Sequence, residues 1–371
     1  MADVSGYESY DPISPVFNYH KIKYVDYDDD LTKLNILAPG DLVNVFISLE
    51  SIYKSISTIQ DLEKKLLLYR DFKSSFISNV LNLAGHYKLF FSRNGLRPRV
   101  FIYQTDLNSD EFPEYKYNDE FRSYYLNKYN ENPKYSYFTD SLKEEIIPDL
   151  IAYCQYIPGT YFINAKNIEG SLVPYIIGNS NKEYKNFIIS TDMFDTQYSG
   201  IDGYCDHLIN RFLRSSDNKY TICTIPGILT KLMSNDPEDT SIVVDTIKPY
   251  HMYCGFLATI GEKQRSIDGI AGIGIKNYTK LIRAGYNTNE FNYDVTNPEM
   301  IGRAFHNKDS MDTFIKNYYC TCIEYMYSHL TEGHLGQILN QITDGYDRNS
   351  MEELNITKFK NHPIVLDNLF N

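Results

Sequence analysis

The residues of this 371-residue chain whose types and spacing suggest chemistry lie in one glycine-rich stretch, SIDGIAGIGIKNYTKLI, at 266–282. Gly272 and Gly274 flank a single isoleucine, and Lys276 follows at the start of an apolar-periodic run. Glycine adopts positive φ and lets a second backbone or a phosphate approach closely. Helix N-terminal amides, assisted by a lysine, hold phosphate groups. The pattern therefore predicts a turn between two helices that binds a phosphate, although similar turns also occur in proteins that bind nothing.

Four short apolar runs separated by helical periodicity must position any such site. Buried strands are predicted at 43–49, 99–105, 160–164 and 186–190, with helices after the first and third runs. This order predicts parallel strands joined by right-handed crossovers, and so an α/β fold. Asp192 follows the fourth run directly. In open parallel sheets ligands bind beyond the carboxyl ends of the strands, which makes Asp192 a candidate site residue.

Composition limits the function further. A net charge of −12 repels nucleic acid at long range, so any such binding needs a local basic surface. No run of apolar residues is long enough to span a bilayer, and the N-terminus does not resemble a signal peptide, which predicts a protein of the host cytoplasm or the virion. The six cysteines follow no disulfide or zinc spacing, and we expect buried thiols. Frequent lysine, asparagine, isoleucine and tyrosine suggest an AT-rich, phage-like genome.

The stretch LATIGEKQRSIDGIAGIGIKNYTKLI at 257–282 resembles the helix-hairpin-helix segment of flap endonucleases and polymerase-associated 5′-nucleases. The segments FIISTDMFDTQY (187–198) and NIEGSLVPYII (167–177) resemble that family's carboxylate-bearing strand end and acidic helix, with Glu169, Asp192 and Gln197 in step. The resemblance covers about residues 43–285. It implies a PIN-like, mostly parallel sheet flanked by helices, with a helical helix-hairpin-helix subdomain. It further implies that Gly269, Gly272, Gly274, Lys276 and Lys280 contact a DNA backbone.

Most of the family's metal-binding carboxylates are replaced in this chain. Ser48 stands at the first-strand position, Gly170 follows Glu169 in the acidic helix, Phe194 replaces the second aspartate after the fourth strand, and Arg265 replaces an acid of the hairpin segment. Two divalent cations need several negative oxygens. We therefore expect no cofactor and a degenerate nuclease that binds DNA or serves as a structural component with other phage or virion proteins.

Two alternatives remain open at this stage. A rearranged set of carboxylates, with Glu169 and Asp192 as metal ligands, would bind Mg²⁺ or Mn²⁺ in an active 5′-3′ exonuclease or flap endonuclease. The chain would otherwise be a purely structural phage protein that does not bind DNA. The candidate catalytic residues of the active alternative are Glu50, Glu169, Asp192, Asp195 and Glu262.

The predicted organisation has three parts. An acidic, tyrosine-rich arm occupies 1–40, the α/β domain 41–220, and a helical part 221–371 that contains the helix-hairpin-helix segment at 257–285. Within the α/β domain, an excursion at 107–148 interleaves lysines and tyrosines with acidic residues, which suits base stacking or a protein-binding surface. A helix is predicted at 311–330. The apolar tail PIVLDNLF is expected to close the core or to dock on a partner.

Overall fold

The computed structural model describes residues 38–49, 69–106, 145–166, 168–189, 194–201, 204–211, 221–222, 249–262, 267–274, 308–343, 348–358 and 364–370. Residues 1–37 of the predicted arm, residues 107–144 of the excursion predicted at 107–148, and the residues Glu50, Asp192, Arg265, Lys276 and Lys280 lie outside these ranges.

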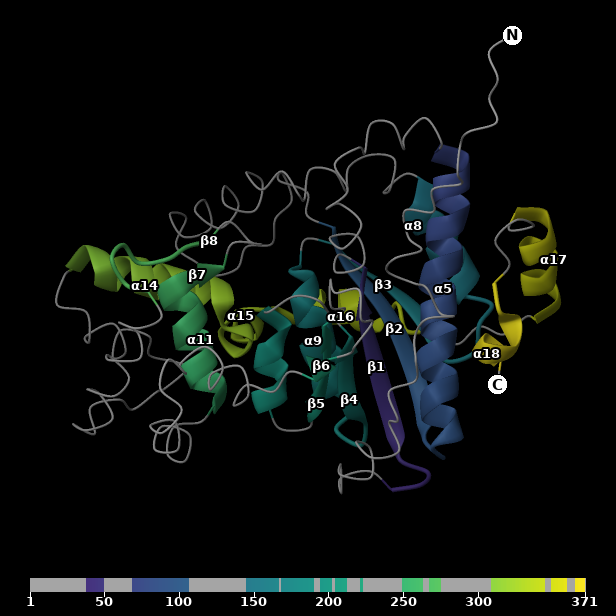
Figure 1. Ribbon diagram of the computed structural model, residues 1–371, viewed down its shortest axis with the longest axis horizontal. Coiled ribbons are helices and arrows are strands. Elements are labelled where there is room, and N and C mark those ends of the chain that lie inside the picture. The colour runs from purple at the N-terminus through teal and green to yellow at the C-terminus, as the bar shows by residue number, and fades with distance from the viewer. Residues whose placement is uncertain are drawn as a thin grey trace, which may run out of the picture.

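A mostly parallel sheet forms the centre of the molecule (Figure 1). Its strands in chain order are β1 (Leu42–Ser48), β2 (Arg97–Asp106), β3 (Thr160–Lys166), β4 (Lys185–Ile189), β5 (Tyr204–Arg211) and β6 (Thr221–Ile222). Their order across the sheet is β3-β2-β1-β4-β5-β6, and among the described strands of this sheet only β6 pairs antiparallel. The four predicted strands are confirmed as β1 to β4, and the α/β class is confirmed with them.

The strand sequences explain why β1 to β4 lie in the middle of the fold. Parallel strands covered by helices on both faces read as continuous apolar runs, and every residue of β1 after Leu42 is buried. Equal register brings Phe46 beside Phe101, and Phe101 beside Tyr161. Their rings stack at centroid distances of 5.2 and 4.9 Å. This aromatic row runs across three strands on one face and aligns them.

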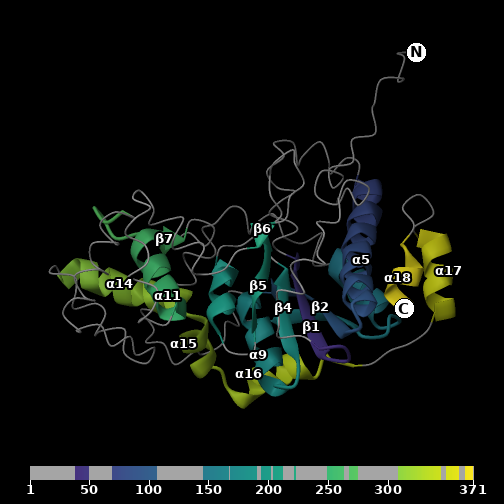
Figure 2. The ribbon, with the colours of Figure 1, turned by 60° about the horizontal axis from the view of Figure 1, so that its bottom comes forward.

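Helices cover both faces of the sheet (Figure 2). On one face α5 (Tyr69–Arg93) and α8 (Ile147–Cys154) share a core with α17 (Arg348–Lys358) and α18 (Leu366–Phe370). The other face carries α9 (Val173–Ser180) and α16 (Glu332–Leu339). The helix predicted after the first strand is confirmed over 69–87 and continues to Arg93, whereas 61–68 lie outside the described ranges.

The hydrophobic core on the face of the sheet that carries α9 and α16 continues into the helices that follow residue 220. It holds side chains of η3 (Gly170–Leu172) and η4 (Phe194–Gly200) together with α11 (Pro249–Ile260), α14 (Lys308–Thr321) and α15 (Ile323–Ser328). Two short strands, β7 (Gly261–Glu262) and β8 (Ile267–Asp268), form an antiparallel pair after α11. One continuous hydrophobic cluster thus contains residues from both sides of position 220, and the division there stays a prediction.

The helix predicted at 311–330 is two helices, which corrects the prediction of a single element. Cys322 separates α14 from α15 and has extended backbone angles, φ −95° and ψ 110°. The cause is Gln197 of η4, whose buried Oε1 accepts a hydrogen bond from the Ile323 N–H at 3.0 Å. Its Nε2 donates to the carbonyls of Thr321 and Phe194, at 3.0 and 2.9 Å. A side-chain amide therefore replaces the acceptor that a continuous helix would supply.

The apolar tail closes the core against α5. Ile364 and Leu369 are buried, and Leu369 packs directly over Gly85, where an added Cβ would lie 3.2 Å from its side chain. Lys88 of α5 donates to the carbonyls of Leu369 and of Pro158, the latter at 2.7 Å. Burial lowers the pKa of Lys88 to about 8. A lysine in this setting joins three segments that are distant in sequence.

We expect Gln197→Leu to lower the free energy of unfolding by at least about 2 kcal/mol, because it leaves a buried N–H and two buried carbonyls without their partner. Urea denaturation measures this loss. The matched control is Gln155→Leu at an exposed position, where the change should stay within about 0.5 kcal/mol. Equal losses in the two variants would contradict the role assigned to Gln197.

The lowered pKa of Lys88 makes the free energy of unfolding depend on pH, and it determines the direction of that dependence. Between the folded value of about 8 and the unfolded value of 10.5, the unfolded chain binds more protons, so stability should rise with pH in this window. We expect Lys88→Met to remove this rise while lowering stability at every pH, since two carbonyls lose their donor. Denaturation at pH 7.5 and 9.5 compares the slopes, and identical slopes in both proteins would refute the assignment.

Candidate functional site

The carboxyl ends of the parallel strands meet at one edge of the sheet. Ser48 at the end of β1 is in register with Tyr103 of β2, and β2 runs three residues further to Asp106, which pairs with Lys166 at the end of β3. Strand β4 ends at Ile189, level with Ile47. The order β3-β2-β1-β4 places the reversal of strand order between β1 and β4, which is where ligands bind in such sheets.

Glu169 lies at this edge, immediately before η3, and is 2% exposed. Its Oε1 accepts a hydrogen bond from the Ser171 hydroxyl at 3.1 Å. The Ser171 carbonyl in turn accepts one from the Tyr198 hydroxyl of η4. Burial, and then the negative charge of Glu169, raise the pKa of the Cys320 thiol in α14. Glu169 is therefore enclosed between the sheet edge and α14.

Gly170 shows why a carboxylate cannot follow Glu169 in this fold. The Gly170 N–H donates to Thr105 Oγ1 at 2.6 Å. A Cβ built on Gly170 would lie 2.5 Å from the same oxygen and 2.9 Å from the Thr105 backbone nitrogen. Real Cβ atoms do not approach backbone so closely, so any side chain at 170 would displace η3 from β2. In the described structure Gly170 is thus a packing contact between η3 and β2.

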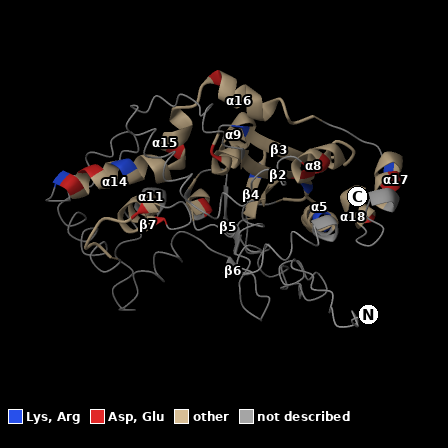
Figure 3. Cartoon of the chain, turned by 90° about the horizontal axis from the view of Figure 1, so that it is seen from above, with Lys and Arg blue, Asp and Glu red and all other residues tan. Residues whose placement is uncertain are grey.

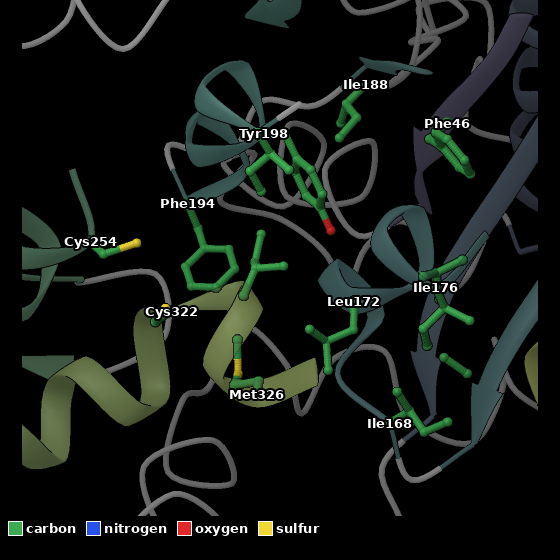
Figure 4. Close-up of a cluster of buried hydrophobic side chains, with 14 of the residues drawn as sticks. Phe46, Ile168, Leu172, Ile176, Ile188, Phe194, Tyr198, Cys254, Cys322 and Met326 are labelled. Carbon is green, nitrogen blue, oxygen red and sulfur yellow. The ribbon is translucent and has the colours of Figure 1, made fainter. Parts of the chain in front are cut away.

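Phe194, at the position of another family carboxylate, is part of the hydrophobic core. It is fully buried and lies among Leu172, Cys322 and Met326 (Figure 4). A charged carboxylate in such surroundings would be strongly disfavoured. Position 194 is thus an apolar position of the described core.

The remaining described candidates are buried in separate elements. Asp195 lies in η4 and is 2% exposed, and Glu262 lies in β7 and is 6% exposed. Across the described ranges, no three His, Cys, Asp or Glu side chains gather closely enough to hold a metal ion. With Gly170 and Phe194 committed to packing, the described residues do not fit a two-metal centre, and we derive no hydrolytic step through one.

The four glycines of the glycine-rich segment are of two kinds. Gly261 and Gly269 lie against neighbouring backbone, whereas Gly272 and Gly274 have no described atom close to an added Cβ. A Cβ on Gly261 would lie 2.4 Å from the Gly269 nitrogen, and one on Gly269 would lie 2.4 Å from the Ile260 carbonyl oxygen. Only glycines allow the β7–β8 pair to sit this tightly against the end of α11. Gly272 has φ +77°, and no described atom lies within 4 Å of a Cβ on Gly272 or Gly274.

Asn317 and Ile270 connect the exposed turn at 271–274, here called the open turn, to the core. Asn317 of α14 is fully buried, and its Nδ2 donates to the carbonyls of Ala258 and Asp268, at 2.8 and 2.7 Å. The Ile270 N–H donates to the Thr259 carbonyl at 2.8 Å, and its side chain is buried in the core. Ala271, Gly272 and Gly274 remain exposed. The turn is thus exposed, and the residues beneath it are buried and hydrogen-bonded.

The described residues revise the predicted turn between two helices in one respect. The segment before Gly269 is the β7–β8 pair rather than a helix, and the residues directly after Gly274 lie outside the described ranges. Sequence reasoning also missed Asn317, whose only signal was a polar residue between the apolar positions of Phe314 and Tyr318. The four described cysteines are buried thiols rather than disulfides, as expected.

No protein-family model matches the chain, and no curated protein matches it. Among solved structures, a lysine-to-alanine mutant of T5 5′-exonuclease is 15% identical with a TM-score of 0.44, covering 81% of this chain and 99% of that one. An aspartate-to-lysine variant of bacteriophage T5 flap endonuclease, in a complex with DNA and metal ions, is 16% identical with a TM-score of 0.47, covering 80% and 98%. None of the helices in the described ranges has the length and apolar character needed to cross a bilayer.

A carboxylate introduced at position 194 should not create a metal centre. We expect Phe194→Asp to lower the free energy of unfolding by about 3–5 kcal/mol, because it removes a buried ring and inserts a charge. Phe194→Leu, which stays apolar, should lose far less. Thermal melts with and without MnCl₂ measure both effects. A large manganese-dependent rise in the melting temperature of Phe194→Asp would show that the position still faces a cation.

Proposed function

We propose that this chain is a nuclease-like protein that binds a nucleic-acid backbone through the open glycine turn and does not cleave it through a two-metal centre. The observation that carries the proposal is the division of the glycines. Gly261 and Gly269 are needed for packing, whereas Gly272 and Gly274 are exposed and have no described atom within 4 Å of an added Cβ. A phosphate can approach an exposed glycine closely because no side chain stands in the way.

In this proposal the contact between the protein and the nucleic acid is confined to the glycine turn and does not extend over a broad basic surface. Basic and acidic residues are interspersed along the described helices, and no single basic face stands out among them (Figure 3). With a net charge of −12, long-range attraction to DNA is weak or absent. Lys276 and Lys280 follow the turn in sequence and are the proposed source of local positive charge. Binding of this kind should be weak and strongly dependent on salt.

The degenerate site is the second half of the proposal. Gly170 is closed to any side chain and Phe194 is part of the core, so two of the family's carboxylate positions serve folding. Glu169 is kept as a buried residue bonded to Ser171. In this proposal the chain acts as a DNA-binding or structural component alongside phage or virion proteins, and the division at residues 40 and 220 is part of it.

Two substitutions separate binding from folding. Gly274→Ala adds a methyl group into open space, so we expect unchanged stability and weaker binding to duplex DNA. Gly269→Ala places its methyl 2.4 Å from the Ile260 carbonyl oxygen and should destabilise the fold instead. Lys276→Ala should weaken binding and reduce the salt slope by about one. Thermal melts compare the stability of the variants, and fluorescence anisotropy across a range of salt concentrations measures their DNA binding. A Gly274→Ala protein that binds like wild type would count against the turn.

A cleavage assay tests the degenerate site separately. The full chain is incubated with flap and 5′-overhang DNA in Mg²⁺ or Mn²⁺, and we expect no cleavage. Cleavage that is lost in Asp192→Ala would establish the alternative of a rearranged carboxylate site. If neither cleavage nor salt-sensitive binding is seen, the chain is a structural protein for which the turn has no ligand.

A further inference from the structure

A small cavity lies at the open edge of the sheet, away from the glycine turn and the carboxyl edge. It has a volume of about 220 Å³ and is formed between α8, the start of β3 and the residues after α16. Its polar lining comes from Gln155, Thr160, Asn340, Gln341 and Thr343, and no lining residue carries a formal charge. The volume is below the range of roughly 300–1,000 Å³ that holds most drug-sized ligands. A ligand for it should be small and neutral.

Strand β3 is an edge strand, and part of its open edge is already covered by side-chain amides. Gln341 Oε1 accepts from the Asn164 N–H at 2.9 Å, and its Nε2 donates to the Asn164 carbonyl at 3.0 Å. Gln337 Nε2 donates to the Lys166 carbonyl at 2.9 Å. One carboxamide thus satisfies both backbone groups of a residue on this edge.

The same pair of backbone groups recurs two residues earlier, at Phe162. Backbone groups of alternate strand residues point to the same side, and the Val100 N–H bonds to the Gly159 carbonyl, so the odd residues of β3 face β2. Phe162 therefore directs its N–H and C=O to the open edge with Asn164. Phe162 lines the cavity. Within the described chain, no hydrogen bond covers this donor and acceptor.

Thr160 supplies a further unused group. Thr160 is 2% exposed and lines the cavity, and its Oγ1 has no hydrogen-bond partner among the described atoms. A buried hydroxyl without a partner is unfavourable, and most buried polar groups in folded proteins are bonded. The donor and acceptor of Phe162 and the hydroxyl of Thr160 thus lie together beside the cavity.

We propose that this cavity binds a small neutral carboxamide, which pairs with Phe162 as Gln341 pairs with Asn164 and takes a third hydrogen bond from Thr160. The same donor–acceptor pair is present in free amides and in the imide edge of a pyrimidine base. A carboxylate of equal size is excluded because it lacks the donor and no described group lining the cavity offsets its charge. The site is independent of the glycine turn and of any nuclease activity.

Ligand-observed NMR and calorimetry on the full chain test this with three probes. We expect nicotinamide to bind with a millimolar dissociation constant and nicotinate, its charged counterpart, to bind at least tenfold more weakly. Uracil is the third probe, and its affinity relative to nicotinamide shows which source of the amide the cavity prefers. Equal binding of nicotinamide and nicotinate, or no binding of nicotinamide and uracil, would overturn the proposal.

Variants at Thr160 tie the binding to this cavity. Thr160→Val keeps the shape and removes the hydroxyl, so nicotinamide binding should weaken about fivefold, as the loss of one hydrogen bond implies. The variant should fold, because it replaces a hydroxyl that has no partner. Thr160→Ser keeps the hydroxyl and should retain more of the affinity. Unchanged nicotinamide binding by Thr160→Val would place the ligand elsewhere and refute the assignment.

Discussion

The amide of Gln197 is the interaction on which the arrangement of this molecule depends. It is fully buried where η4, α11 and the junction of α14 with α15 meet, and its two ends satisfy one N–H and two carbonyls. Such a network is strong in a low-dielectric interior because every member has a partner. It ends α14 at Thr321 and redirects the chain into α15, which brings Met326 against Phe194. The helices beyond residue 220 are thereby joined to the sheet through polar as well as apolar contacts.

Packing at this junction also shapes the edge of the sheet where the carboxyl ends of the parallel strands meet. A two-metal nuclease keeps this region polar and open to cations, whereas here Phe194 and Leu172 fill it and Gly170 lies against Thr105. The glycine segment is constrained differently, since Gly272 and Gly274 are exposed while Asn317 bonds the backbone beneath them. The two regions that the sequence resemblance connects therefore have separate physical constraints in this chain. Phe194 and Gly170 lie in the core, and the glycine turn lies at the surface.

The strands were predictable because continuous apolar runs bounded by polar residues have few other solutions, and β1 to β4 lie at the predicted positions. The resemblance also identified Gly170 and Phe194 as departures from the nuclease pattern. It could not show that both are closed to a carboxylate, because that depends on Thr105 and Met326, which are distant in sequence. The break at Cys322 was unpredictable for the same reason: α14 and α15 form one periodic pattern, and the amide that interrupts them lies 126 residues earlier. The cavity beside β3 also joins segments that no local pattern connects.

The packing of α18 on α5 bears on how the chain folds as it is synthesised. Lys88 and the Leu369 carbonyl that it contacts are 281 residues apart. The face of α5 around Gly85 therefore stays uncovered until residues 364–370 leave the ribosome, although the strands it covers are made far earlier. A nascent chain of this protein exposes this apolar face of α5 for most of its translation, and that is the state in which chaperones would bind it.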